Sequence, residues 1–153
     1  MKCVVDSSGW IHYLLNGPLA ERYAKYIQKP SHVLTPAIVV YEVYKTVKRS
    51  ANEDLACEAI SALQETVMVP LDAYLARSAA DISLHHKLSM ADAVVYASAG
   101  KYGVPLYTSD IDFKNLPNVK YVSAEESETD PPRHVRYIFK WPGDDSQSTF
   151  RSL

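Results

Sequence analysis

The feature of this sequence that most constrains its fold is the alternation of short apolar runs with longer segments of helical pattern. The short runs predict five β-strands, over residues 2–5, 32–35, 67–69, 105–108 and 119–122. The longer segments predict helices over residues 10–15, 19–27, 36–49, 53–65, 72–87 and 89–102. Strands that alternate with helices are typical of an α/β fold whose parallel sheet is covered on both faces. We therefore expect one parallel sheet of five strands with helices on its two faces.

Residues that commonly cap helices mark where several of these helices should begin or end. Asp72 and Ser89 stand at expected N-caps, where a side-chain oxygen can accept a backbone N–H. Thr35 is expected to cap the helix after the second strand, with Pro36 at its first position. Gly103 follows the last long helix, at a place where a left-handed residue often ends one.

Length and composition fit one soluble domain. The chain has 153 residues, of which 47% are hydrophobic and 22% are charged. No apolar run approaches the ~18 residues that a membrane span needs. The N-terminus, MKCVVDSSGW, leads directly into a strand and lacks the pattern of a signal peptide. Cys3 and Cys57 are isolated, which favours a reducing environment, so we expect a cytoplasmic protein with no membrane partner.

The composition changes after Ala124, and we expect residues 1–124 to form the domain and residues 125–153 to form a C-terminal extension. The extension starts with an acidic run and Pro131-Pro132, and it continues with HVRYIFKWPGDD. We expect a mobile tail or a strand added to an edge of the sheet. Its basic and aromatic residues offer a less favoured contact with RNA or a partner: Arg133, Arg136, Tyr137, Lys140 and Trp141.

Four carboxylates stand where a parallel sheet would bring them together. Asp6 and Asp110 directly follow strands, Glu42 lies in the helix after the second strand, and Asp92 lies in the first turn of a helix that precedes a strand. In α/β sheets the carboxyl ends of the strands form one edge, and ligands bind there. We therefore expect these carboxylates to meet at that edge.

Each carboxylate also has a purely structural interpretation when it is taken alone. Asp6 and Asp110 fit turns or helix caps, and Asp92 forms an imperfect capping box with Ser89. Glu42 is at a spacing that allows an ion pair with Lys45 or Arg49.

The joint placement favours a metal site over these separate interpretations. Two carboxylates about 4 Å apart repel by roughly 4 kcal/mol at an effective dielectric near 20. Oxygen ligands suit Mg²⁺ or Mn²⁺, and the sequence shows no His/Cys set with zinc spacing. The net charge of −2 disfavours a protein that coats DNA but is compatible with an enzyme that has an acidic, metal-filled site.

Four segments, in this order and spacing, resemble PIN-domain ribonucleases, and among them the VapC-type toxins of toxin–antitoxin pairs. The segments are VVDSSGWIHYLL, TPAIVVYEVYK, LSMADAVVYASA and PLYTSDIDF, which is followed by LPNVKYV, and the match covers about residues 2–124. The resemblance implies a three-layer α/β/α fold with strand order 3-2-1-4-5. It also implies an Mg²⁺- or Mn²⁺-dependent endoribonuclease that acts as a homodimer and is neutralised by a small antitoxin.

The resemblance assigns roles to individual residues. It implies that one or two metal ions are held by a catalytic quartet: Asp6, Glu42, Asp92 and Asp110. Asp112 matches a further acid that assists from the outer shell or a second site. Small polar residues would orient the ligands or water: Ser7, Ser8, Thr108 and Ser109. Three basic residues on the helix of Glu42 are candidates for holding the RNA backbone, although a solvated helix face is the commoner explanation: Lys45, Lys48 and Arg49. The extension after Ala124 is longer than such toxins usually carry.

Other functions remain open at the level of sequence. A housekeeping RNA-processing nuclease and a non-catalytic RNA-binding scaffold would share this fold. A phosphotransferase with Asp6 as its covalent nucleophile would be expected to carry a second Asp two residues later, where this chain has Ser8.

Overall fold

A computed structural model describes residues 1–124, and its centre is one parallel sheet. The predicted extension, residues 125–153, lies outside the described residues, so its boundary stays a prediction. The strands are β1 (Cys3–Val5), β2 (Val33–Pro36), β3 (Val67–Val69), β4 (Leu106–Thr108) and β5 (Val119–Tyr121). Their order is β3-β2-β1-β4-β5 and every pairing is parallel. The predicted fold class and strand order are therefore confirmed.

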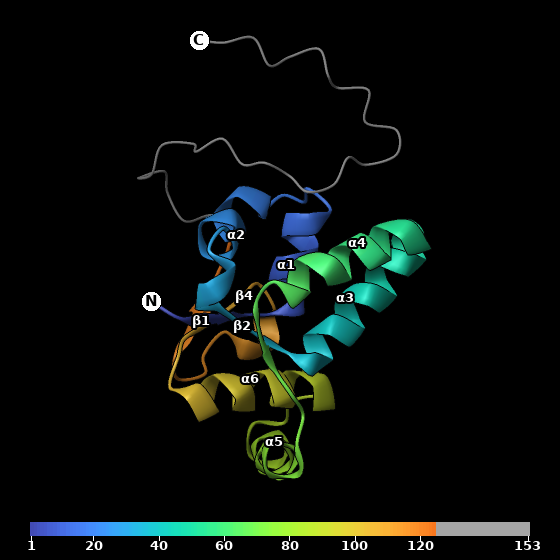
Figure 1. The fold of residues 1–153 in the computed structure, drawn as a ribbon. Helices are drawn as coiled ribbons and strands as arrows, with labels where there is room; N and C mark the ends of the chain where they lie inside the picture. The colour runs from blue at the N-terminus through green and yellow to red at the C-terminus, as the bar shows by residue number, and fades with distance from the viewer. Residues whose placement is uncertain (125–153) are drawn as a thin grey trace, which may run out of the picture.

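Helices cover both faces of the sheet, as Figure 1 shows. The helices are α1 (Ser7–Leu14), α2 (Ala20–Ile27), α3 (Ala37–Ser50), α4 (Glu53–Gln64), α5 (Ala73–His86) and α6 (Met90–Tyr102). In the view of Figure 1, α1, α2 and α4 lie above the strands, α3 lies to their right, and α6 lies below them with α5 outside α6. The inner strands β1 and β2 are buried along their whole length, which explains their unbroken apolar sequence.

The strand order reverses between β1 and β4. The chain builds outward from β1 through β2 to β3, and then crosses back to add β4 and β5 on the other side. Such a reversal leaves a crevice beyond the carboxyl ends of the two central strands. Asp6 follows β1 and Asp110 lies two residues after β4, so the topology puts both at this crevice.

Two predicted helix starts are wrong. Helix α1 begins at Ser7, one turn before the expected Trp10, because the Asp6 carbonyl accepts the N–H groups of Gly9 and Trp10. Helix α3 begins at Ala37, after Pro36 has paired in β2. Thr35 therefore does not cap it.

The Thr35 hydroxyl is used inside the protein instead. It accepts a hydrogen bond of 2.6 Å from the buried Thr66 hydroxyl. Thr35 lies within the buried strand β2, and Pro36 rather than Thr35 occupies the N-cap position of α3.

The other predicted caps are confirmed. Asp72 accepts the Leu75 N–H at 2.7 Å, and Gly103 ends α6 in the left-handed region at a φ of 61°. Ser89 caps α6 and is described with the site below. No helix in the described part of the chain is both long enough and apolar enough to cross a membrane.

Candidate metal centre

Asp6 is a buried carboxylate at the end of β1, with 3% of its surface exposed. It occupies the N-cap position of α1, but its side chain makes no capping hydrogen bond. One oxygen, Oδ2, instead accepts hydrogen bonds from the Ser8 hydroxyl at 3.0 Å and the Thr108 hydroxyl at 2.9 Å. Burial raises the pKa of Asp6 above its usual value, and these hydroxyls oppose the rise. Asp6 therefore stands at the N-cap position, and its backbone carbonyl accepts the first N–H groups of α1, but its carboxylate does not cap the helix.

The two hydroxyls that hold Asp6 also tie it to the loop after β4. Thr108 accepts the Asp110 N–H at 3.0 Å, and Ser8 accepts the Ser109 N–H at 3.3 Å. The chain segments after β1 and after β4 are thus joined at the reversal point of the sheet. The structure brings together Asp6 and three of the four predicted supporting residues in one network.

Glu42 faces the same carboxylates from α3. Burial is the main cause that raises the pKa of Glu42 to about 7, and repulsion from Asp6, Asp92 and Asp110 adds to it. A hydrogen bond with the Ser7 side chain acts in the opposite direction. None of the ion pairs among the described residues includes Glu42. The alternative of a pair with Lys45 or Arg49 is not formed.

Asp92 faces Asp110 and Asp112 across the edge of the sheet. Ligand oxygens of these three carboxylates all lie within 4.8 Å of one another. The Ser89 hydroxyl donates to Asp92 Oδ2 at 2.6 Å, and the Asp92 N–H donates back to Ser89 Oγ at 3.3 Å. Burial raises the pKa of Asp92, and repulsion from Asp110 and Asp112 raises it further.

The capping interpretation of Asp92 is therefore correct but incomplete. Ser89 caps α6 and at the same time orients one oxygen of Asp92. The Asp92 carboxylate lies beside the carboxylates of Asp110 and Asp112, and a residue that only caps a helix does not need such neighbours. Asp110 is also a cap, since its Oδ1 accepts the Asp112 N–H at 2.9 Å.

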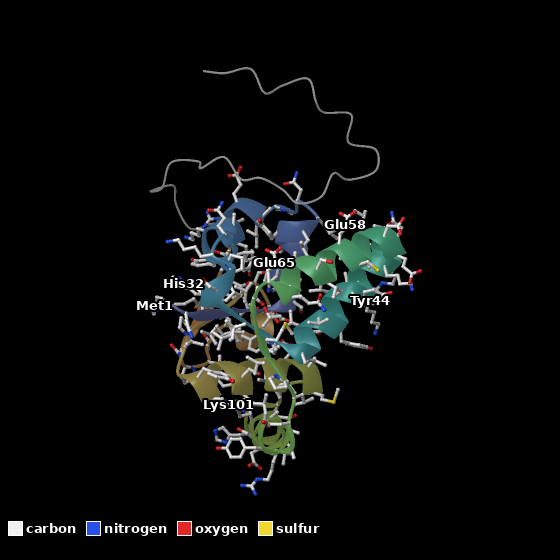
Figure 2. All side chains as sticks on the ribbon, in the orientation of Figure 1. Met1, His32, Tyr44, Glu58, Glu65 and Lys101 are labelled. Atoms are coloured by element: carbon white, nitrogen blue, oxygen red, sulfur yellow. The ribbon has the colours of Figure 1, made fainter. Side chains whose placement is uncertain are left out.

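The predicted RNA-binding residues lie further along α3 and differ in their surroundings. Lys48 forms an ion pair of 2.9 Å with Glu53 and also contacts the Tyr44 hydroxyl at 3.3 Å (Tyr44 is labelled in Figure 2). Lys45 lies over the ring of Tyr41, 5.4 Å from its centroid. The ion pair of Lys48 fits a solvated helix face, whereas Lys45 has no acidic partner among the described ion pairs.

A tyrosine that the sequence does not single out lies beneath the network. Tyr23, on α2, has no exposed surface, and its hydroxyl neighbours Ser8 and Ser109. It stands in an ordinary helical pattern, so only the packing of α2 against α1 places it here. No motif in the sequence could have identified it.

The donor set fits a hard divalent cation. Asp92, Asp110 and Asp112 form a cluster, Asp6 and Glu42 interact electrostatically with members of it, and none of the described ion pairs includes a member of the quartet. Carboxylate oxygens are ligands of Mg²⁺ and Mn²⁺. The fit rests on these donors, and burial, with a smaller contribution from neighbouring carboxylates, raises the pKa values of Asp6, Glu42 and Asp92.

Comparison with solved structures finds the same fold in toxin–antitoxin proteins. A toxin–antitoxin complex from Klebsiella pneumoniae has 20% identity and a TM-score of 0.66, over 82% of this chain and 100% of the other. VapC20 from Mycobacterium tuberculosis, described as a Sarcin-Ricin loop cleaving toxin, has 23% identity and a TM-score of 0.67, over 77% and 97%. VapBC2 from Rickettsia felis, bound to promoter DNA, has 14% identity and a TM-score of 0.63, over 79% and 98%.

The family follows from the sequence match, since these structures show the fold alone. No curated protein matches the chain significantly in sequence. The model of the PIN domain family, however, matches residues 3–119, which include β1, the whole acidic edge and the start of β5. With this match and the observed strand order, the chain belongs to the PIN domain family.

Proposed function

We propose that this protein is a metal-dependent endoribonuclease that hydrolyses RNA phosphodiester bonds. The observation that carries the proposal is the cluster of Asp92, Asp110 and Asp112, with which Asp6 and Glu42 interact electrostatically. A PIN domain with all four acids in place has the oxygen ligands that a divalent cation needs, and a bound cation would in turn attract a phosphate. The structural neighbour VapC20, described as a Sarcin-Ricin loop cleaving toxin, supports the same activity.

The quartet would hold one or two Mg²⁺ or Mn²⁺ ions, with Asp112 assisting from the outer shell or a second site. When bound, the ion neutralises charge on the scissile phosphate and activates a water as the nucleophile. The chemistry needs no His, Lys or Ser nucleophile, so the residues of the chain act by holding and orienting groups.

Hydroxyl groups prepare the carboxylates for this role. Ser8 and Thr108 both donate to Oδ2 of Asp6 and so hold this carboxylate in one orientation. Ser89 fixes Oδ2 of Asp92 in the same way. Such partners of metal ligands commonly affect metal affinity or activity by 10–100-fold.

The test is RNA cleavage with Mn²⁺ on a panel of structured and single-stranded RNAs. We expect Asp6→Asn and Asp92→Asn to lose at least about a hundredfold in rate, because each removes a charged ligand. Asp72→Asn is the matched control. Asp72 caps α5 and pairs with Lys101, which lies at the end of α6 opposite Asp92 (labelled in Figure 2).

Equal cleavage by wild type, Asp6→Asn and Asp92→Asn would contradict the proposal. Asp72→Asn should retain wild-type activity, since Asn is as good a cap as Asp and the exposed ion pair contributes little.

We further propose a toxin role, with a small antitoxin as partner, a homodimeric state and a cytoplasmic location. Solved toxin–antitoxin complexes of the same fold support this role over a housekeeping RNA-processing one. A short reading frame directly upstream of this one, whose product binds the protein and blocks cleavage, is the expected finding. RNA binding that metal does not convert into cleavage would instead favour a non-catalytic scaffold.

A further inference from the structure

A pocket with a volume of about 300 Å³ lies at the amino ends of the strands, at the opposite edge of the sheet from the carboxylates. Cys3 starts β1 in the wall of this pocket, and His32 and Pro105 stand just before β2 and β4. Figure 2 labels two of its lining residues, Met1 and His32. Among the described residues, those that line the pocket include no aspartate or glutamate but three exposed lysines, and we call it the basic pocket: Lys2, Lys25 and Lys29.

The lysines of the basic pocket have no acidic partner among the described ion pairs. The helix dipole favours a lysine in the last turn of a helix, and Lys25 has that position in α2. The dipole does not explain Lys2, which precedes β1, so the gathering of positive charge requires another reason. Cations that line one concave surface attract an anion to it.

The described part of the chain ends beside α2. Arg22 Nη2 donates to the Ala124 carbonyl at 3.2 Å. Arg22 and Lys25 are one helical turn apart on α2 and so lie on the same face of the helix. Lys29 follows the end of the helix, at about 10 Å from Arg22 if the helical rise is continued. The chain beyond Ala124 therefore starts at one end of a row of cations that leads to the basic pocket.

The sequence beyond Ala124 carries the complementary charge. Residues 125–130, EESETD, contain four carboxylates and no cation. Such a segment, when extended, reaches about 20 Å, which is roughly twice the length of the cationic row. The carboxylates at the other edge of the sheet repel this acidic segment, whereas the basic pocket attracts it. Charge and reach both favour the basic pocket as its binding place.

We propose that the acidic segment, residues 125–130, docks along Arg22, Lys25 and Lys29, with its carboxylates in the basic pocket. Segment and pocket belong to one chain, so the effective concentration of the carboxylates is high and several weak ion pairs suffice. A separate anion would have to displace the segment. The inference does not depend on the proposed function, because it uses no residue of the acidic edge.

The test is paramagnetic broadening of NMR signals in the full chain, with a spin label on Ser127→Cys in a Cys57→Ser background. Cys57 is exposed and is therefore replaced, whereas burial raises the pKa of the Cys3 thiol to about 11 and keeps it unreactive. At about 0.1 M NaCl we expect loss of the amide signals of Tyr26 and His32, which line the pocket. At about 1 M NaCl these signals should recover, because the Debye length falls from about 10 Å to about 3 Å.

Charge reversal tests whether the lysines carry the contact. Lys25→Glu with Lys29→Glu should abolish the broadening, and the further changes Glu126→Lys and Glu128→Lys should restore it. Arg77→Glu is the matched control, because Arg77 is an exposed cation on α5 that does not line the pocket. This variant should show the same broadening as the labelled protein without charge reversal.

Several results would overturn the proposal. One is the absence of broadening at low salt, and another is broadening that persists at high salt or in the lysine variant. Equal loss of broadening in Arg77→Glu would show that net charge, and not the basic pocket, holds the segment. If inorganic phosphate or a short RNA shifts the pocket signals while the label leaves them unchanged, the pocket binds a separate anion and the proposal is wrong.

Discussion

At the scale of the residue, the central feature is the way in which one oxygen of Asp6 is held. Oδ2 accepts two hydroxyl protons inside the protein, from Ser8 and Thr108. Two donors on one oxygen are an arrangement that fixes the plane of the carboxylate. The sequence motif predicts that an acid stands here. It does not show that the neighbouring hydroxyls hold one oxygen, since Thr108 is 102 residues away.

Glu42 gives a prediction on pH. Its pKa of about 7 in the folded protein lies above the usual value of 4.5 for this group. The folded state thus binds a proton more tightly than the unfolded state, and this contribution to stability is complete below about pH 4.5 and lost as pH rises through about 7. Asp6 and Asp92 are shifted in the same direction. We expect the metal-free protein to melt lower at pH 7.5 than at pH 5.

Thermal melts of wild type and Glu42→Gln in EDTA at pH 5 and pH 7.5 measure this effect. The difference in melting temperature between the two pH values should be smaller in Glu42→Gln, which carries no charge at this position. Glu58→Gln, at an exposed position of α4 labelled in Figure 2, should behave like wild type. The same pH difference in all three proteins would contradict the assignment of Glu42.

At the scale of the element, the short connection from β1 to α1 determines where the side chains next to Asp6 lie. The helix begins one residue after Asp6, so Ser7 and Ser8 fall in its first turn and face the carboxylates. This close start depends on Gly9, because α2 brings the Tyr23 ring against it. The Asp-Ser-Ser-Gly sequence resembles a turn, so local propensity alone places the helix start too late.

Gly9 and Gly100 form a matched pair for testing this packing. Gly9→Ala should destabilise the protein by about 1–3 kcal/mol, because the added Cβ atom collides with Tyr23 and Val5. Gly100→Ala should stabilise it by about 0.5–1 kcal/mol, since nothing lies within 4 Å of the added atom and alanine favours the helix. Chemical denaturation measures both. Equal stability of the two variants would show that α1 and α2 are not tightly packed there.

The sequence predicts a helix start correctly where the cap is a side chain that bonds to a backbone N–H close to it in the chain. Asp72 and Ser89 cap helices with their own side chains, within three residues, and the sequence shows them. Thr35 has the same chemistry but bonds to Thr66, 31 residues away, and the sequence gives no sign of that. The order of the strands came from the resemblance to a family, because alternation of strands and helices does not by itself determine it.

At the scale of the whole molecule, the fold gathers like charges and leaves them unpaired by any described ion pair. Four segments that are far apart in the sequence contribute them, after β1, in α3, at the start of α6 and after β4. Such an arrangement costs stability unless protons or a cation neutralise it. The acidic residues come together only because the strand order of the sheet places their four segments at one edge.

Divalent metal should therefore stabilise the folded protein at neutral pH. At a hundred times its Kd, a ligand that binds only the folded state adds about 2.7 kcal/mol to the free energy of unfolding. We expect Mn²⁺ to raise the melting temperature at pH 7.5 and to raise it less at pH 5, where protons compete for the carboxylates. Asp6→Asn should reduce the shift. No shift in wild type at saturating Mn²⁺ would speak against a metal site.

The most direct measurement is a crystal structure of the wild-type protein grown with Mn²⁺, with anomalous data that locate the metal. We expect an anomalous peak at the acidic edge, from a metal bound by oxygens of Asp6 and of at least one carboxylate from α6 or from the loop after β4. A structure at saturating Mn²⁺ with no peak at this edge, or with peaks only elsewhere on the molecule, would contradict it.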